Sequence, residues 1–264
     1  MPIHPTAIVD PRAEIDPTAE IGPYVVVEGP VRVGPRTRVL AHATLCGWTT
    51  LGADNVIHMG AVIGHEPQDK AFAGEESYLS VGDRNVIREH VQMHRGTKPG
   101  SETVVGSDNY FMANAHVAHN CRVGDGVIFA NGAVIGGYVQ IEDRVFLSGN
   151  CTVHQFVRVG RLALLRGLTR VDRDVPPFCI ADGLNCVRAI NRVGLRRAGF
   201  DAEQTHAVHV AFRRLFLRAG NLRQRVDALA AEPGSAAVRY LIEFIRASTR
   251  GVCQGPRRPL HGDE

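Results

Sequence analysis

The residue types best suited to catalysis lie in segment 114–121, which contains two histidines three positions apart, His116 and His119. An imidazole titrates near neutral pH and can act as a general base. Gly137 follows His119 by eighteen positions, and Gln155 follows Gly137 by eighteen more. A base beside a backbone N–H that no side chain covers suits acyl transfer to a hydroxyl group, because the alcohol loses a proton while the carbonyl becomes an oxyanion. An isolated histidine is usually an ordinary surface or core residue, so a catalytic role requires that the fold bring these positions together.

Hydrophobic residues recur at every sixth position along most of the chain, a period that neither an α-helix nor an ordinary strand has. One frame runs from Ile3 to Ile63, returns at 81–93 and continues from Val105 to Val171. Six-residue units are typical of a parallel β-helix, in which three units close a coil of about eighteen residues. Residues about eighteen apart then lie above one another at about 4.8 Å. The pattern therefore predicts a mainly β fold that stacks the base, the glycine and the glutamine in one column.

The repeat is interrupted twice and is followed by a different pattern. Interruptions at 65–80 and 97–104 are predicted to be surface loops. Near residue 190 the pattern becomes helical: Asp201 is expected to cap a helix that runs to about Arg218, and helices are expected over 221–231 and 235–249. We therefore predict a β-helical domain over 1–189 and a small helical domain over 190–264.

Composition argues against several classes of function. A formal net charge of +3 is too small to indicate nucleic-acid binding, and the clustered arginines of the helical part are interpreted as solvated faces. No apolar run approaches the length of a membrane span, and the repeat begins too early to leave room for a signal peptide, so we expect a cytoplasmic protein. The six cysteines form no CxxC pair, so no zinc site or disulfide framework is expected.

Several short motifs, in order, carry a resemblance to a known family over essentially the whole chain. They are Gly-Asp-Arg-Asn (82–85), Ile-Arg-Glu (87–89), His-Arg-Gly-Thr (94–97), Gly-Ser-Asp-Asn (106–109), segment 114–121, Val-His-Gln-Phe (153–156), Asp-Val-Pro-Pro (174–177) and Gly-Leu-Arg-Arg-Ala-Gly-Phe (194–200). The chain resembles the UDP-N-acetylglucosamine acyltransferases of lipid A biosynthesis. These enzymes move a 3-hydroxyacyl chain from acyl carrier protein to the 3-hydroxyl of UDP-N-acetylglucosamine, the first step of that pathway.

The resemblance implies a left-handed β-helix, a homotrimer and a set of site residues. It makes His119 the base and the Gly137 N–H the oxyanion donor, with no metal and no cofactor beyond the phosphopantetheine thioester of the donor. It implies that substrate contacts come from Asp69, His116, Tyr138, His154, Gln155, Asn191 and Arg197, of which Asn191 and Arg197 would reach across from a neighbouring subunit. Gly167 matches the position that measures the acyl chain, and glycine there favours a medium to long chain. His94, Arg95 and Arg88 are candidates for contact with the carrier protein or its phosphopantetheine.

Five positions depart from the pattern common in the family. Asn120 stands where an aspartate often follows the base, and Tyr138 replaces a histidine near the sugar. Ala71 replaces a lysine that binds phosphate, with Lys70 beside it; Ala198 replaces the second of two arginines, and Val193 a carboxylate. Because these positions concern the acceptor more than the base, an acceptor with a 3-amino group, or another nucleotide sugar, stays an alternative.

Three other functions are associated with this fold or with a chain of this kind. The sister N-acyltransferase of the pathway has an additional N-terminal domain, whereas the repeat here begins at Ile3. A γ-class carbonic anhydrase binds zinc through three histidines, two of them in a His-x4-His pair, whereas this chain has His116-x2-His119 and His90-x3-His94. A catalytically silent trimeric scaffold is the alternative that is not an enzyme, and it predicts no effect of replacing His119. The sequence leaves open the role of the C-terminal helices.

Overall fold

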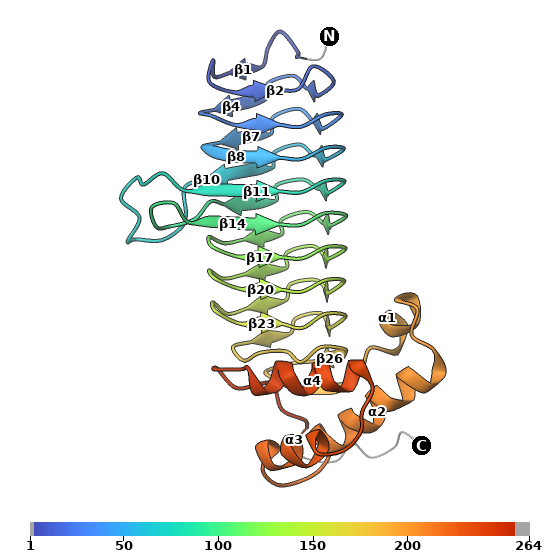
Figure 1. The fold of residues 1–264 in the computed structure, drawn as a ribbon. Coiled ribbons are helices and arrows are strands. Elements are labelled where there is room, and N and C mark those ends of the chain that lie inside the picture. The colour runs from blue at the N-terminus through green and yellow to red at the C-terminus, as the bar shows by residue number, and fades with distance from the viewer. Residues whose placement is uncertain (1–2, 257–264) are drawn as a thin grey trace.

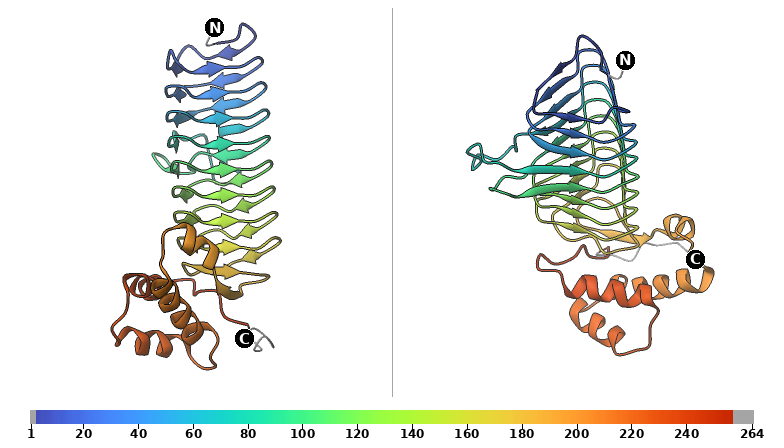
Figure 2. Two further views of the ribbon diagram at one scale, coloured as in Figure 1. Left: turned by 90° about the vertical axis from the view of Figure 1, so that its right-hand side faces the viewer. Right: turned by 45° about the horizontal axis from the view of Figure 1, so that its top comes forward.

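The computed structural model describes residues 3–256, which form a tall prism of short strands with a helical unit at its C-terminal end (Figures 1 and 2). The predicted domains reach residues 1 and 264, so the ends of both predictions, 1–2 and 257–264, lie outside the described residues. Three parallel sheets form the three faces of the prism, and the chain visits them in turn once per coil. The parallel β-helix predicted from the period of six is confirmed.

The three sheets are here called sheet 1, sheet 2 and sheet 3. Sheet 1 contains β1 (Ile8–Val9), β4 (Val26–Glu28), β7 (Thr44–Cys46), β10 (Val62–His65), β13 (Gln92–His94), β16 (His116–Val117), β19 (Val134–Ile135), β22 (Thr152–Val153) and β25 (Arg170–Val171). Sheet 2 contains β2 (Glu14–Ile15), β5 (Arg32–Val33), β8 (Trp48–Leu51), β11 (Tyr78–Val81), β14 (Glu102–Val105), β17 (Arg122–Val123), β20 (Gln140–Ile141) and β23 (Arg158–Val159). Sheet 3 contains β3 (Glu20–Ile21), β6 (Arg38–Val39), β9 (Val56–Ile57), β12 (Val86–Ile87), β15 (Tyr110–Phe111), β18 (Ile128–Phe129), β21 (Phe146–Leu147), β24 (Leu164–Leu165), β26 (Cys179–Ala181) and β27 (Val187–Ile190).

Register between coils follows the predicted eighteen-residue spacing. Ile8 pairs with Val26, and His116 pairs with Val134. The offset grows to thirty between Val62 and Gln92 and to twenty-four between Gln92 and His116, because the two insertions add residues without adding a coil. The insertions form neighbouring loops, after β10 and after β13, that project from one side of the prism (left in Figure 1).

The aliphatic residue of each hexad fills the interior of the prism. Leu45, Ile63, Ile87 and Phe111 are fully buried. Burying such a side chain contributes about 1.5–3 kcal/mol each, so one row of side chains drives both coil formation and coil stacking. Outward-facing neighbours carry charge, as in the ion pair between Arg38 and Glu20 of adjacent coils.

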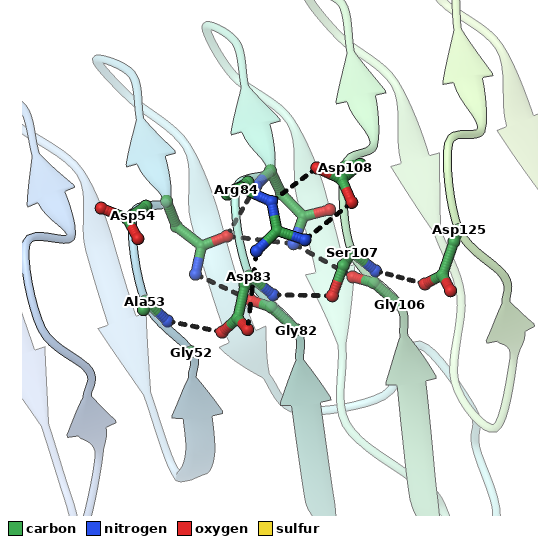
Figure 3. A network of polar contacts seen from close by, with 12 residues as sticks. Gly52, Ala53, Asp54, Gly82, Asp83, Arg84, Gly106, Ser107, Asp108 and Asp125 are labelled. Atoms are coloured by element: carbon green, nitrogen blue, oxygen red, sulfur yellow. Dashed lines mark hydrogen bonds and ion pairs between the residues drawn. The ribbon is translucent and has the colours of Figure 1, made fainter.

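Polar side chains tie successive coils together at the corner between sheets 2 and 3 (Figure 3). Asp83 accepts the Ala53 N–H at 2.7 Å, Ser107 accepts the Asp83 N–H at 3.0 Å, and Asp125 accepts the Ser107 N–H at 2.6 Å. At the same corner Asn85 accepts the Asn109 N–H at 3.0 Å. Each bond satisfies a backbone donor that the turn leaves without a strand partner.

Three buried asparagines form a ladder inside this corner. The Asn55 Oδ1 accepts both the backbone N–H of Asn85 at 2.9 Å and its side-chain amide at 3.0 Å. Asn109 then continues the ladder to Val127, whose N–H it accepts at 2.6 Å. The ladder therefore links the coils from which both insertion loops leave the prism.

The C-terminal unit begins where β27 turns antiparallel to β26, near the predicted boundary at residue 190. Its helices are α1 (Arg192–Arg197), α2 (Ala202–Phe216), α3 (Leu222–Ala230) and α4 (Ala236–Arg246). The predicted Asp201 cap is confirmed, with a complete capping box to Gln204, but α2 ends two residues before the predicted Arg218. The short α1 was not predicted, because it has only six residues and no apolar period.

Helix α4 packs against the last coils of the prism (Figure 1). The Arg158 guanidinium lies 4.2 Å from the centre of the Phe244 ring, and that of Arg161 lies 4.1 Å from the centre of the Tyr240 ring. The Tyr240 hydroxyl also donates a hydrogen bond to Glu142. The two domains are therefore joined by cation–π contacts and a polar bond as well as by apolar burial.

Candidate active site

His119 lies in the turn between β16 and β17, with 12% of its side chain exposed. Its Nδ1 is 3.0 Å from the Oδ1 of Asn120, and the same Oδ1 accepts the Thr97 N–H at 3.0 Å. An atom that already faces one donor is the carbonyl oxygen of the amide, so Nδ1 must carry the proton and donate it. Nε2 is left with a free lone pair, which is the form that a general base requires.

Gly137 lies against this imidazole, as the column predicts. A Cβ atom there would fall 2.6 Å from Cε1 and 2.7 Å from Nε2 of His119, so only glycine leaves the ring in place. Within residues 3–256 the Gly137 N–H donates no hydrogen bond, although its carbonyl accepts from Phe156 at 3.0 Å. The turn therefore places an imidazole beside a glycine whose N–H is unbonded within the described residues.

Asp69 faces the base from the first insertion loop. Its Oδ2 lies 3.9 Å from Nε2 of His119, and its Oδ1 accepts the Ala71 N–H at 3.0 Å. A hydroxyl group that donates to Nε2 would lie within reach of this carboxylate as well. The loop thus closes one side of the space in front of the base.

Two further histidines pack beside the base. The rings of His94 and His116 are 5.1 Å apart, and Nδ1 of His94 is 2.6 Å from the Glu66 carbonyl, to which it donates. Burial, with smaller contributions from His94 and His119, lowers the pKa of His116 to about 4, and burial also lowers the pKa of His94. Both imidazoles are therefore neutral at physiological pH and offer lone pairs or N–H groups rather than charge.

An aromatic column continues below the base. The edge of His119 meets Tyr138 at 5.4 Å, and Tyr138 stacks on Phe156 at 4.9 Å. Both aromatic residues have left-handed backbones, with φ of 61° and 65°, the conformation that Asn120 adopts one coil earlier. Phe156 was not predicted as a site residue, although it follows Tyr138 by eighteen positions and is half exposed.

The next coil places His154 and Gln155 on the surface below Gly137. Nδ1 of His154 lies 3.5 Å from Nη2 of Arg250, which comes from the segment after α4. The Arg250 guanidinium is held there by the Asp172 carbonyl at 3.2 Å. Arg250 is a cation near the site that the sequence did not indicate, since only the folded C-terminal segment brings it there.

Gly167 lies on a different corner from the base, between sheets 3 and 1. It is exposed, and a Cβ atom there would meet the Gly149 carbonyl at an ordinary 3.6 Å. Arg166 pairs with Asp182 at 3.2 Å. Sheet 1 therefore separates Gly167 from His119 along the surface.

Asn191 and Arg197 lie far from His119 within one chain. They line a groove of about 2270 Å³ between sheet 3 and the helices, and α1 lies on the opposite side of the prism from the Asp69 loop (Figures 1 and 2). Asn191 caps α1 by accepting the Gly194 N–H at 2.9 Å and donates to the Leu162 carbonyl at 2.9 Å. Its amide thus has structural partners, whereas the exposed Arg197 has no ion pair or hydrogen bond within residues 3–256.

Arg95, a candidate for contact with the carrier protein or its phosphopantetheine, is buried. Its side chain is only 7% exposed and lies against the first insertion loop. Arg88 is more exposed, at 38%, but pairs with Glu89 at 3.0 Å. Residues 3–256 contain no group of three or more His, Cys, Asp or Glu side chains placed to hold a metal ion, and no helix among them could cross a membrane.

The stacked hexads, with a histidine and a glycine side by side at one corner, are those of a hexapeptide-repeat transferase. Residues 102–137 match the model of the bacterial transferase hexapeptide, and residues 174–253 match that of UDP N-acetylglucosamine O-acyltransferase, domain 2. The acyl-[acyl-carrier-protein]–UDP-N-acetylglucosamine O-acyltransferase of Syntrophobacter fumaroxidans is 43% identical over 96% of this chain and 99% of its own, and that of Anaeromyxobacter sp. is 46% identical with the same coverage. The chain belongs to this family of O-acyltransferases.

Solved structures agree with this assignment. The UDP-N-acetylglucosamine acyltransferase of Francisella novicida matches with a TM-score of 0.91 at 32% identity, over 97% of this chain and 95% of its own. The enzyme of Bacteroides fragilis matches with a TM-score of 0.89 at 38% identity, over 95% of this chain and 99% of its own. The fold is accordingly the left-handed parallel β-helix that the resemblance implied.

Proposed function

We propose that the protein transfers a 3-hydroxyacyl chain from the phosphopantetheine thioester of acyl carrier protein to the 3-hydroxyl of UDP-N-acetylglucosamine, the first step of lipid A biosynthesis. Membership of the O-acyltransferase family supports the reaction and both substrates. The observation that carries the mechanism is the pairing of a free Nε2 on His119 with an unbonded N–H on Gly137.

In the first half of the reaction, His119 Nε2 takes the proton of the sugar 3-hydroxyl as its oxygen attacks the thioester carbonyl. The carbonyl π electrons move to oxygen, and the Gly137 N–H donates to this oxyanion. Asp69, with Oδ2 3.9 Å from Nε2, faces the imidazolium that forms. Asn120 keeps the proton of Nδ1 in place throughout.

In the second half, the oxyanion re-forms the carbonyl and the C–S bond breaks. The imidazolium returns its proton to the leaving thiolate, so the products are the 3-O-acyl sugar nucleotide and the free thiol of the carrier. The proposed route uses no metal, no further cofactor and no covalent intermediate with the enzyme, because the thioester arrives already activated.

The same proposal includes a homotrimer whose sites lie between subunits. Asn191 and Arg197 lie across the prism from His119, so they can join the site only from a second copy of the chain. An arginine supplies the forked donors that a diphosphate needs.

Mixed trimers of His119→Ala and Arg197→Ala subunits test this arrangement. They should recover activity, because some clefts between subunits would contain neither substitution. If both residues of a site came from one subunit, the mixed trimers would have no activity.

Mass spectrometry of the product tests the reaction itself. The purified protein would be incubated with UDP-N-acetylglucosamine, or its 3-amino analogue, and 3-hydroxyacyl carrier proteins of increasing chain length. We expect a 3-O-acyl product with medium to long chains, in keeping with the open surface at Gly167. Product from the 3-amino analogue alone would move the proposal to that acceptor, and no product with either acceptor would favour a silent scaffold.

A further inference from the structure

Arg95 is the most deeply buried charged side chain near the site, and the proposed mechanism does not use it. It follows β13, and only 7% of its side chain is exposed. Its Nη1 donates to the Gly64 carbonyl at 3.2 Å, whereas its buried Nε has no partner within the described residues. A guanidinium withdrawn from water to this extent needs specific contacts to offset its lost hydration.

Those contacts fall mainly on the insertion loop that carries Asp69. The guanidinium carbon lies 5.2 Å from the centre of the Phe72 ring, and Nη2 lies 3.6 Å from a carboxylate oxygen of Glu66. The backbone N–H of Arg95 donates to the His65 carbonyl at 3.2 Å. Arg95 therefore holds the loop on both sides of Asp69, three residues before it and three residues after it.

The guanidinium also lies against the coil that carries β7 and β8. The Trp48 ring centre is 5.8 Å away, and a Cβ atom on Gly47 would fall 3.1 Å from Nη1, so glycine leaves room for the arginine there. His94 adds a second connection, since its Nδ1 donates to the Glu66 carbonyl at 2.6 Å. His94 and Arg95 thus contact residues 64–66, where β10 ends and the loop begins, and Arg95 also contacts Phe72 within the loop.

We propose that Arg95 is a positioning residue that fixes the 66–77 loop so that Asp69 stands opposite His119. This inference rests on the proposed function, in which Asp69 faces the reacting hydroxyl. The backbone of the loop completes the connection, because Phe72 donates its N–H to the Asp69 carbonyl at 3.1 Å. Holding the loop in this way requires a guanidinium. The planar group contacts the Phe72 ring and the Gly64 carbonyl at the same time, which a lysine ammonium cannot do.

A double-mutant cycle tests this role. Arg95→Lys should lower kcat/KM for the sugar nucleotide by about tenfold to a hundredfold, the order of loss that a displacement of about 1 Å produces. Asp69→Asn should cause a comparable loss, and the double variant should be no slower than Asp69→Asn alone, because Arg95 acts through Asp69. Arg84→Lys is the matched control, since Arg84 pairs with Asp108 at another corner, and it should keep wild-type kinetics. If the loss of kcat/KM in the double variant were the product of the losses in the two single variants, the proposal would be overturned.

Amide hydrogen exchange gives a readout that needs no turnover. Arg95→Lys should speed exchange in residues 66–77 at least tenfold, while β12 and β15 exchange as in the wild type. Unchanged exchange in the loop would refute the role of Arg95 in holding it. If the wild type makes no product at all, the proposed function fails, but the exchange result still decides whether Arg95 holds the loop.

Discussion

Replacing Gly137 by alanine tests the placement of the base without removing any functional group. The backbone of Gly137 is not in the left-handed region, so alanine can adopt its conformation, and the N–H that we assign to the oxyanion is retained. The new Cβ would lie 2.6 Å from Cε1 of His119, against at least 3.4 Å for ordinary contact. The imidazole must therefore move by about 0.8 Å.

A displacement of this size should lower kcat/KM by about tenfold to a hundredfold, since about 1 Å of misplacement costs on the order of a hundredfold. This corresponds to about 1.4–2.7 kcal/mol of transition-state stabilisation. The assay is the initial rate of 3-O-acyl product formation over a range of UDP-N-acetylglucosamine concentrations, with thermal unfolding measured on the same samples. Gly234→Ala is the control, because its Cβ would meet Val238 at an ordinary 3.5 Å far from the site. Wild-type activity of Gly137→Ala, with an unchanged melting temperature, would refute the assignment of this imidazole as the base.

Three further predictions follow from contacts in and near the site. Asn120→Ala removes the acceptor that fixes the His119 tautomer and should lower kcat about a hundredfold with little change in KM. Asn120→Asp keeps an oxygen at that place and should retain most activity. Equal rates for the two variants would contradict the role of Asn120 in fixing the tautomer. Asn85→Ala leaves the buried Asn109 N–H without its acceptor and the Gly106 carbonyl without the Asn85 amide, and it should cost about 3 kcal/mol in urea unfolding. Asp108→Ala, at the exposed side of the same corner, should cost much less; a similarly small loss at Asn85 would show that the ladder is dispensable. In the unfolded chain His116 binds a proton below its ordinary pKa of 6.5, whereas in the folded chain it does so only near its lowered pKa of about 4. The free energy of unfolding should therefore fall as the pH decreases from 7 to 5. His116→Gln should weaken that pH dependence.

The sequence predicted the features that depend on the repeat. Because residues eighteen apart must stack, the column of His119, Gly137 and Gln155 followed from spacing alone, and the buried aliphatic rows followed from the period of six. Phe156 could have been found by the same rule, since it occupies the corner position after Tyr138. The Asp201 cap was readable because its capping box is local in sequence.

Features that depend on the insertions were not predictable in the same way. No period relates Asp69 to His119 or Arg95 to Phe72, so their approach emerges only when the loop is folded against the prism. The burial of Arg95 was not predictable either, because it depends on the loop that lies against its side chain. The role of Asn191 as the N-cap of α1 was not predicted, because α1, at six residues, is too short to leave a hydrophobic pattern.

The most direct test of the central claim is the single-turnover rate of acyl transfer by His119→Ala, with enzyme in excess over the acyl donor. General-base catalysis supplies about a hundredfold to ten-thousandfold, so we expect a loss of that order, while UDP-N-acetylglucosamine binding measured by calorimetry changes little. An unchanged rate in His119→Ala, with the sugar nucleotide still bound, would contradict the mechanism proposed for this site.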